Sequence, residues 1–77
     1  MEKRGEMNPM ESKIGRLRRQ ARLFRGKRVI VIFCDGREIT GRLVRVRRTF
    51  IILRIRRRGV FIRIRIPFID IKDIDLA

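Results

Sequence analysis

At 77 residues the chain has room for one small domain, near the lower limit at which a hydrophobic core holds without help. Its single cysteine excludes an intrachain disulfide, and no apolar run approaches the roughly 20 residues of a membrane-spanning helix. The net charge of +14 indicates an anionic partner, and without a signal peptide or membrane segment we expect a cytoplasmic protein that binds no membrane.

The positive charge is concentrated and rich in arginine. Residues 13–65 contain 19 basic residues but only two acidic ones, Asp35 and Glu38. Arginine outnumbers lysine 18 to 4, and its planar fork of donors suits phosphate oxygens and stacks on bases. This bias favours nucleic acid as the partner. A solvated, solubilising face is the alternative, and the same arginines, with 13 isoleucines, would also fit a heat-loving source.

Residues 1–8 carry no periodic pattern and are expected to form a flexible arm, which leaves 9–77 as the folded domain. The start of that domain has the signals of a helix N-terminus. Asn8 suits the N-cap, Pro9 the first helical position, and Glu11 would complete a capping box.

The helix that these signals open is predicted to be amphipathic. Its apolar stripe consists of Ile14, Leu17, Ala21 and Phe24. The other side is basic and includes Arg18 and Arg22. Because spacings of three and four place residues on one helical face, the stripe should pack on a core, and Gly26 is expected to end the helix as its C′ residue.

The pattern then changes to that of strands. The segment 28–34 is apolar on both faces and should be covered from both sides, with the helix a candidate for one of them. The Asp-Gly dipeptide at 35–36 predicts a hairpin turn. The segment 37–48 alternates, holds Gly41 and shifts phase at 43–44, which indicates a bulged, sharply bent strand.

The segment 53–66, LRIRRRGVFIRIRI, alternates arginine with apolar residues on both sides of a turn at 58–59. Since successive side chains of a strand point to opposite faces, this hairpin should have one apolar face and one face of guanidinium groups. The second face is predicted to be a two-row grid of Arg54 and Arg56 opposite Arg63 and Arg65. Arginines that face one another repel unless anions lie between them, so the grid is expected to bind phosphate.

Further arginines should extend this surface. They are Arg47, Arg48, Arg57 and Arg58 from the adjoining loops. Arg18 and Arg22 on the basic side of the helix are also candidate nucleic-acid-binding residues. Phe50 and Phe61 have the parity of the arginine faces. They could stack on bases, or they could be covered by a subunit interface or by the helix.

After Pro67 interrupts the hairpin, residues 70–76 are predicted to form a short last strand. One helix followed by five short strands predicts a mainly β fold: a five-stranded, strongly bent small barrel of the SH3-like kind with a leading helix.

The segment 26–46, GKRVIVIFCDGREITGRLVRV, resembles the first signature of the Sm-like proteins, a strand, an Asp-Gly turn and a Gly-x-Leu on a bent second strand. The matching positions are Gly26, Val29, Val31, Asp35, Gly36, Gly41, Leu43 and Val46. The resemblance covers roughly residues 10–76 and implies a small barrel of archaeal type that binds RNA and self-associates into rings through its fourth and fifth strands. The C-terminal domain of the ribosome maturation factor is similar to a lesser extent, and its Ile-Pro…Asp-Ile segment would match 66–74.

Two departures from the Sm-like pattern matter. Uridine-binding members resemble one another in an Asp-x-aromatic-x-Asn loop, and the corresponding positions here hold Arg47, Thr49 and Ile51. The second signature, Ile-Arg-Gly, is matched only loosely by residues 64–66. The resemblance therefore implies the fold but not a uridine-specific pocket.

The chain offers little for catalysis. It has no histidine or tyrosine, one serine and one cysteine, so no nucleophile with a base in reach can be proposed. We expect no enzyme activity, no cofactor and no small-molecule substrate. Cys34, in an apolar segment, is expected to be a small buried hydrophobe. The acidic residues of the last strand, Asp70, Asp73 and Asp75, are expected to pair with arginines or a neighbouring subunit rather than to hold a metal.

The interpretation that follows is an RNA-binding protein that contacts mainly the phosphate backbone, as a ring-shaped homo-oligomer within a ribonucleoprotein. The first alternative is a monomeric SH3-like barrel embedded in ribosomal RNA, which the missing uridine-reading residues favour. The second is a small DNA-coating chromatin protein. RNA ranks above DNA because of the family resemblance and not because of any residue.

Overall fold

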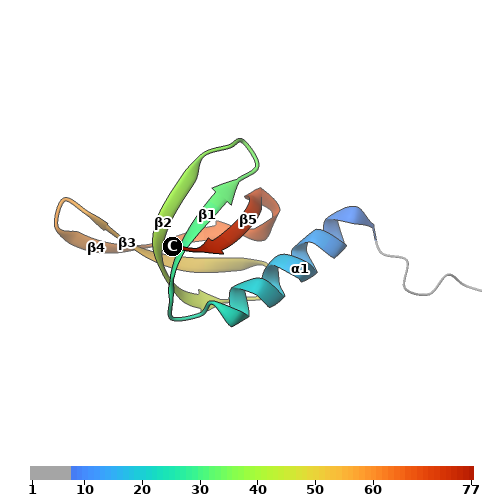
Figure 1. The fold of residues 1–77 in the computed structure, drawn as a ribbon, viewed down its shortest axis with the longest axis horizontal. Coiled ribbons are helices and arrows are strands. Elements are labelled where there is room, and N and C mark those ends of the chain that lie inside the picture. The colour runs from blue at the N-terminus through green and yellow to red at the C-terminus, as the bar shows by residue number, and fades with distance from the viewer. Residues whose placement is uncertain (1–7) are drawn as a thin grey trace, which may run out of the picture.

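A computed structural model describes residues 8–77 of the chain (Figure 1). The elements in order are α1 (Pro9–Leu23), β1 (Arg28–Phe33), β2 (Glu38–Val46), β3 (Phe50–Arg57), β4 (Val60–Pro67), the 3₁₀ helix η1 (Phe68–Asp70) and β5 (Ile71–Leu76). The five strands form one antiparallel sheet in the order β4-β3-β2-β1-β5. The predicted mainly β fold with a leading helix is confirmed in this form. The predicted arm lies outside the described residues, apart from Asn8.

The start of α1 is as predicted, and its end is not. The Asn8 side chain accepts a hydrogen bond of 2.8 Å from the Glu11 backbone N–H, so Asn8 belongs to the helix cap rather than to an arm. The last helical residue is Leu23, with Phe24 as the C-cap. Gly26 does not cap α1 directly. It takes a φ of +84° in the turn beyond, where its N–H donates to the Leu43 carbonyl on β2.

β1 is fully buried on one face only. Val29 and Val31 have no exposed surface, whereas Ile30 and Ile32 are half-buried. Polar residues flank these two isoleucines across the sheet, namely Glu38 and Thr40 on β2 and Asp73 and Asp75 on β5. The helix packs mainly on β2, β5 and η1. The cover expected on both faces of β1 is therefore incomplete.

β2 joins the two halves of the sheet. It pairs with β1 through 38–42 and with β3 through 42–46, so Arg42 has a partner on both sides. The register shifts between Leu43 and Arg45, which confirms the predicted bulge. A Cβ atom at Gly41 would lie 2.7 Å from the backbone oxygen of Arg54, so this position tolerates only glycine.

The β3–β4 hairpin extends beyond the rest of the sheet. The pairing of β3 with β2 ends at Arg54, so residues 55–62 pair only with one another, and Figure 1 shows the hairpin projecting from the molecule. Its turn consists of Arg58 at a φ of +54° and Gly59 at +80°. Two consecutive residues of positive φ are what a tight hairpin turn needs.

The core lies between α1 and the inner face of the sheet. Its fully buried members are Leu17, Ala21, Val29, Val31, Leu43, Ile51, Leu53, Phe68, Ile71 and Ile74. Phe68 comes from η1, the turn that follows the predicted interruption at Pro67. No helix within residues 8–77 is long and apolar enough to cross a membrane.

The prediction of a buried cysteine is wrong. Cys34 is exposed, because β1 ends one residue before it and the chain turns away from the core there. Lys13 Nζ lies 3.3 Å from its Sγ atom.

Candidate nucleic-acid interface

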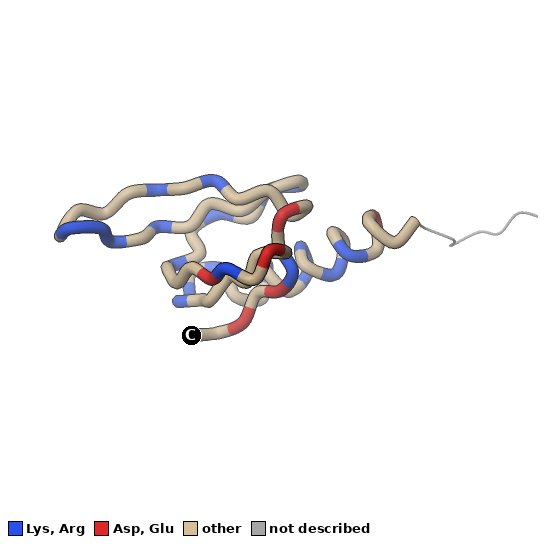
Figure 2. The backbone as a smooth tube through the Cα atoms, turned by 90° about the horizontal axis from the view of Figure 1, so that it is seen from above, with Lys and Arg blue, Asp and Glu red and all other residues tan. Residues whose placement is uncertain are grey.

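Among the described residues, the arginine-rich hairpin and most of the acidic residues lie in different parts of the molecule. Figure 2 shows basic positions along the β3–β4 hairpin, which has no acidic residue, and acidic positions at the β1–β2 turn, in β5 and at the helix start. Within residues 8–77 the only ion pair joins Arg37 to Asp35, at 2.7 Å. The hydrogen bond from the Arg37 backbone N–H lowers the pKa of the Asp35 carboxyl. Every other arginine of residues 8–77 therefore has no carboxylate from this part of the chain within ion-pair distance.

Four arginines form a line across the sheet that the sequence did not reveal. Cross-strand partners share a face, and the registers pair Arg28 with Arg42, Arg42 with Arg54, and Arg54 with Arg63. With neighbouring strands about 4.8 Å apart, this line is about 14 Å long. We call these four residues the arginine row. It lies on the outer face of the sheet, opposite the core.

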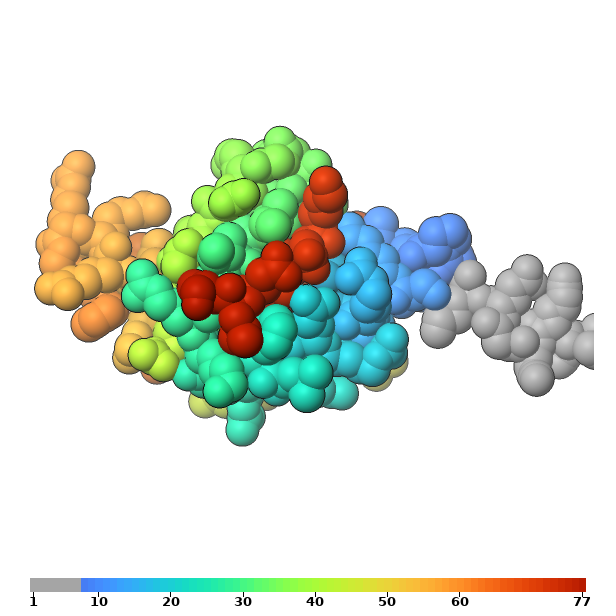
Figure 3. Space-filling model, viewed as in Figure 1, coloured from blue at the N-terminus to red at the C-terminus, as the bar shows by residue number. Residues whose placement is uncertain are grey.

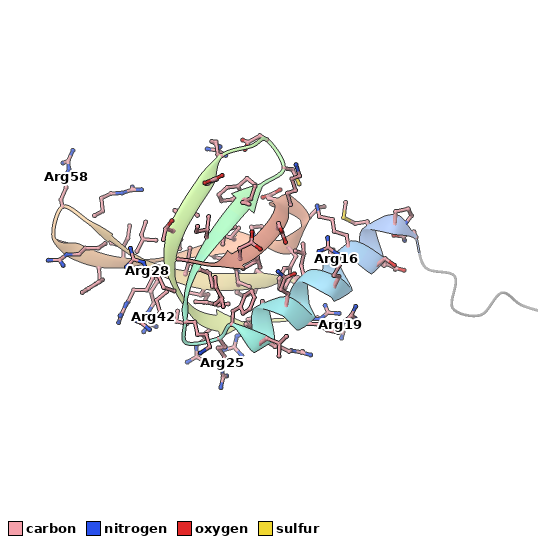
Figure 4. All side chains as sticks on the ribbon, in the orientation of Figure 1. Arg16, Arg19, Arg25, Arg28, Arg42 and Arg58 are labelled. Atoms are coloured by element: carbon pink, nitrogen blue, oxygen red, sulfur yellow. The ribbon has the colours of Figure 1, made fainter. Side chains whose placement is uncertain are left out.

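Arg28 and Arg42 are candidate binding residues that the sequence did not indicate. Figure 4 shows them side by side next to the hairpin, far from Arg16 and Arg19 on α1. Arg28 is the first residue of β1. Arg42, on β2, pairs with β1 on one side and with β3 on the other. Neither belongs to a visible run of alternating arginines, so only the strand register brings them beside Arg54.

The predicted two-row grid is only partly correct. Arg54 lies opposite Arg63, but Arg56 lies opposite Phe61, and Arg65 opposite Ile52. The predicted grid therefore contains one direct arginine pair, because Arg56 and Arg65 each have an apolar residue as their cross-strand partner. This offset reduces like-charge repulsion along the hairpin.

The two phenylalanines of the outer face hold guanidinium groups. The Arg54 and Arg56 Cζ atoms lie 4.6 and 5.6 Å from the centre of the Phe61 ring. The Arg65 Cζ atom lies 4.8 Å from the centre of the Phe50 ring. These contacts are within the range of cation–π attraction. Phe61 nevertheless keeps 58% of its surface exposed, and neither the helix nor another described element covers it.

A hollow of about 460 Å³ lies beside the arginine row, and we call it the row hollow. It is lined by Arg28, Thr40, Gly41, Arg42, Arg54, Ile55, Arg56 and Phe61. Figure 3 shows the hairpin, in orange, standing apart from the body of the molecule. The lining within the described part of the chain has no acidic residue, and the Arg54 Nε atom is buried there without a hydrogen-bond partner.

A second group of arginines lies apart from the arginine row, so these residues do not extend the hairpin surface as one continuous patch. Arg18 and Arg22 on α1 meet Arg47 and Arg48 from the β2–β3 turn around a hollow of about 450 Å³. We call these four residues the helix-side cluster. The Arg18 Nη1 atom donates a 2.7 Å hydrogen bond to the Arg48 carbonyl, which ties the turn to the helix.

The remaining predicted arginines lie at the hairpin tip. Arg57 pairs with Val60 and faces the opposite side from Arg56, while Arg58 is in the turn. The tip therefore presents guanidinium groups on both of its faces. Of the ten predicted binding residues, the structure groups four in the helix-side cluster and brings Arg54 and Arg56 to the row hollow.

The acidic residues of the last strand are not engaged by arginine. Within residues 8–77 none of Asp70, Asp73 and Asp75 forms an ion pair, although Asp73 accepts a hydrogen bond from the Ile74 backbone N–H. No group of three His, Cys, Asp or Glu side chains in this part of the chain is placed to hold a metal ion.

The arrangement of a leading helix and five antiparallel strands is consistent with the topology of Sm-like proteins. Comparisons with protein-family models, with curated proteins and with solved structures find no match to this chain.

Proposed function

We propose that the protein binds RNA, mainly through the phosphate backbone, with the outer face of its sheet and the helix-side cluster. The observation that carries this proposal is the arginine row, whose four like charges stand in line with no carboxylate partner among the described residues. Side chains in this arrangement repel one another until anions lie between them. A chain of phosphates supplies such anions at regular intervals, without sequence readout.

The Sm-like barrel belongs to the same proposal. The strand order leaves β4 and β5 as the two edges of the sheet. An unpaired edge tends to pair with another chain. β4 carries Arg63 and Arg65, while β5 carries Asp73 and Asp75, so β4 of one copy and β5 of the next have complementary charge. We propose that this pairing closes the protein into a ring-shaped homo-oligomer within a ribonucleoprotein.

A second candidate is a monomeric component of a large ribonucleoprotein such as the ribosome. The hairpin tip favours it, because Arg56 and Arg57 face opposite sides and Arg58 occupies the turn. A tip with positive charge on both faces suits a site that RNA surrounds, rather than a surface contacted from one side.

Two measurements test the proposal and separate its two forms. Binding of unrelated RNA sequences is expected to be similar, with affinity that falls steeply and linearly in log–log form as salt rises. Absence of RNA binding at low salt would refute the proposal. Light scattering of nuclease-treated protein then gives its mass. A multiple of 9.3 kDa supports the ring, and a 9.3 kDa monomer supports the second candidate.

A further inference from the structure

The row hollow has the chemistry of a site for one nucleotide with an unpaired base. We propose that the protein binds single-stranded nucleic acid there, with a phosphate held by Arg28, Arg42 and Arg54 and the adjoining base stacked on Phe61. This inference rests on the proposed function. It names the residues that contact one nucleotide, and no family resemblance suggests those residues.

The phosphate side of the site is formed by three neighbouring strands. Arg28, Arg42 and Arg54 are consecutive members of the arginine row and all line the row hollow. Arg42 Nη1 donates a 2.7 Å hydrogen bond to the Gly26 carbonyl, which fixes this side chain while its other donors are left for a ligand. The Arg54 Nε atom is buried beside the hollow with no partner. The guanidinium of Arg54 therefore has one unmet donor, which a shift of this side chain towards a bound phosphate would satisfy.

The base side of the site is the Phe61 ring. It lies on the same face as Arg54 and Arg56, lines the row hollow and is 58% exposed. The two guanidinium groups are within 4.6 and 5.6 Å of its centre, so they restrict its orientation. An exposed aromatic ring flanked by arginines is the usual platform for a base of a single strand.

The size and position of the hollow favour an unpaired base over a duplex. Its volume of about 460 Å³ lies in the range of small-ligand sites. A duplex stacks its bases on one another, so they cannot reach Phe61 without unpairing. The hollow also lies where the hairpin leaves the sheet, which lets a strand enter from the open side.

The stacking half is tested with two single strands of about 12 nucleotides, an oligouridine and an abasic strand with the same phosphates. Phe61→Ala is expected to weaken binding of oligouridine roughly five- to hundredfold and to leave the abasic strand unaffected. Phe61→Leu, which keeps the apolar cover but removes the ring, should behave in the same way and serves if Phe61→Ala fails to fold. Equal losses on both strands, or no loss, would overturn the stacking assignment.

The phosphate half is tested with Arg28→Gln/Arg42→Gln against Arg16→Gln/Arg19→Gln, which removes the same charge from α1, away from Arg28 and Arg42 (Figure 4). The first double variant is expected to weaken both strands at least about tenfold and to reduce the salt slope by about 0.7 for each lost phosphate contact. The second should change affinity less than about threefold. Arg28→Gln alone keeps the Arg42 hydrogen bond and checks for a folding effect.

The outcomes distinguish a failure of the proposed nucleotide site from a failure of the proposed function. If wild-type protein binds both strands but the two double variants are weakened equally, the site is wrong and the proposed function stands. If a matched duplex binds more tightly than the single strand at equal phosphate number, the single-strand assignment is wrong. If wild-type protein binds no strand at low salt, both proposals fail together.

Discussion

Arg58 adopts a backbone conformation that arginine disfavours. Its φ of +54° lies in the left-handed region, where a residue with a long side chain costs about 1 kcal/mol. Asparagine and glycine are the residues that such turns prefer. The arginine therefore costs stability at this position, and under the proposed function its charge serves RNA binding.

Arg58→Asn is therefore expected to raise the free energy of unfolding by about 0.5 to 1 kcal/mol and to weaken RNA binding. Urea denaturation measures the first effect and filter binding the second. Arg57→Asn removes the same charge from a strand position and is the matched control, which should not stabilise the fold. A destabilised Arg58→Asn variant would contradict this account.

Replacement by alanine is expected to have opposite effects on stability at Gly41 and at Gly15. A Cβ at Gly41 would come within 2.7 Å of a backbone oxygen that cannot move independently. A Cβ at Gly15, within α1, would meet only the end of the Arg19 side chain, at 3.5 Å. The first site is closed to a methyl group and the second is open.

Gly41→Ala is expected to lower the free energy of unfolding by about 2 kcal/mol or more, because β2 and β3 would have to separate. Gly15→Ala should raise it by about 0.5 to 1 kcal/mol through helix propensity. Thermal and urea denaturation of the two variants check both signs. Equal changes in the two proteins would show that the contact at Gly41 is not the cause.

At the scale of elements, local signals located the helix and strands well. The cap of α1, the positions of β1, β2 and β5 to within about two residues, the turn at 58–59 and the bulge after Gly41 all follow from residue type and alternation. The Cys34 side chain was misplaced because β1 ends one residue earlier than its apolar run. The apolar run of the sequence continues to Cys34, one residue beyond the last residue of β1.

The candidate site depended on register, which the sequence did not determine. A two-residue turn at 35–36 would pair Arg28 with Leu43 and put it on the wrong face. The observed loop has three residues, since Phe33 and Arg37 close it by a hydrogen bond and Gly36 has a φ of +94°. This single added residue aligns Arg28 with Arg42. The four arginines of the helix-side cluster were candidates without any knowledge of register, because each lies on a helix face or in a loop, but the sequence did not show that they meet.

At the scale of the whole molecule, a net charge of +14 with one described ion pair makes self-repulsion the main electrostatic effect. Salt screens the repulsion between like charges, and with only one described ion pair it weakens little attraction in return. The melting temperature is therefore expected to rise by about 5 °C as sodium chloride increases from about 0.05 to 0.5 M. Differential scanning calorimetry without RNA provides the measurement, and a Tm that stays constant or falls would contradict it.

The projecting hairpin is expected to make the protein susceptible to proteolysis at one place. Residues 55–62 are held only by each other, so their tip can open while the core stays folded. Three consecutive arginines, 56–58, make that tip the expected first cleavage site for trypsin. RNA bound along the outer face should shield it. Mass spectrometry of a brief digestion would then show whether the tip is covered, and early cleavage elsewhere in 8–77 would contradict this expectation.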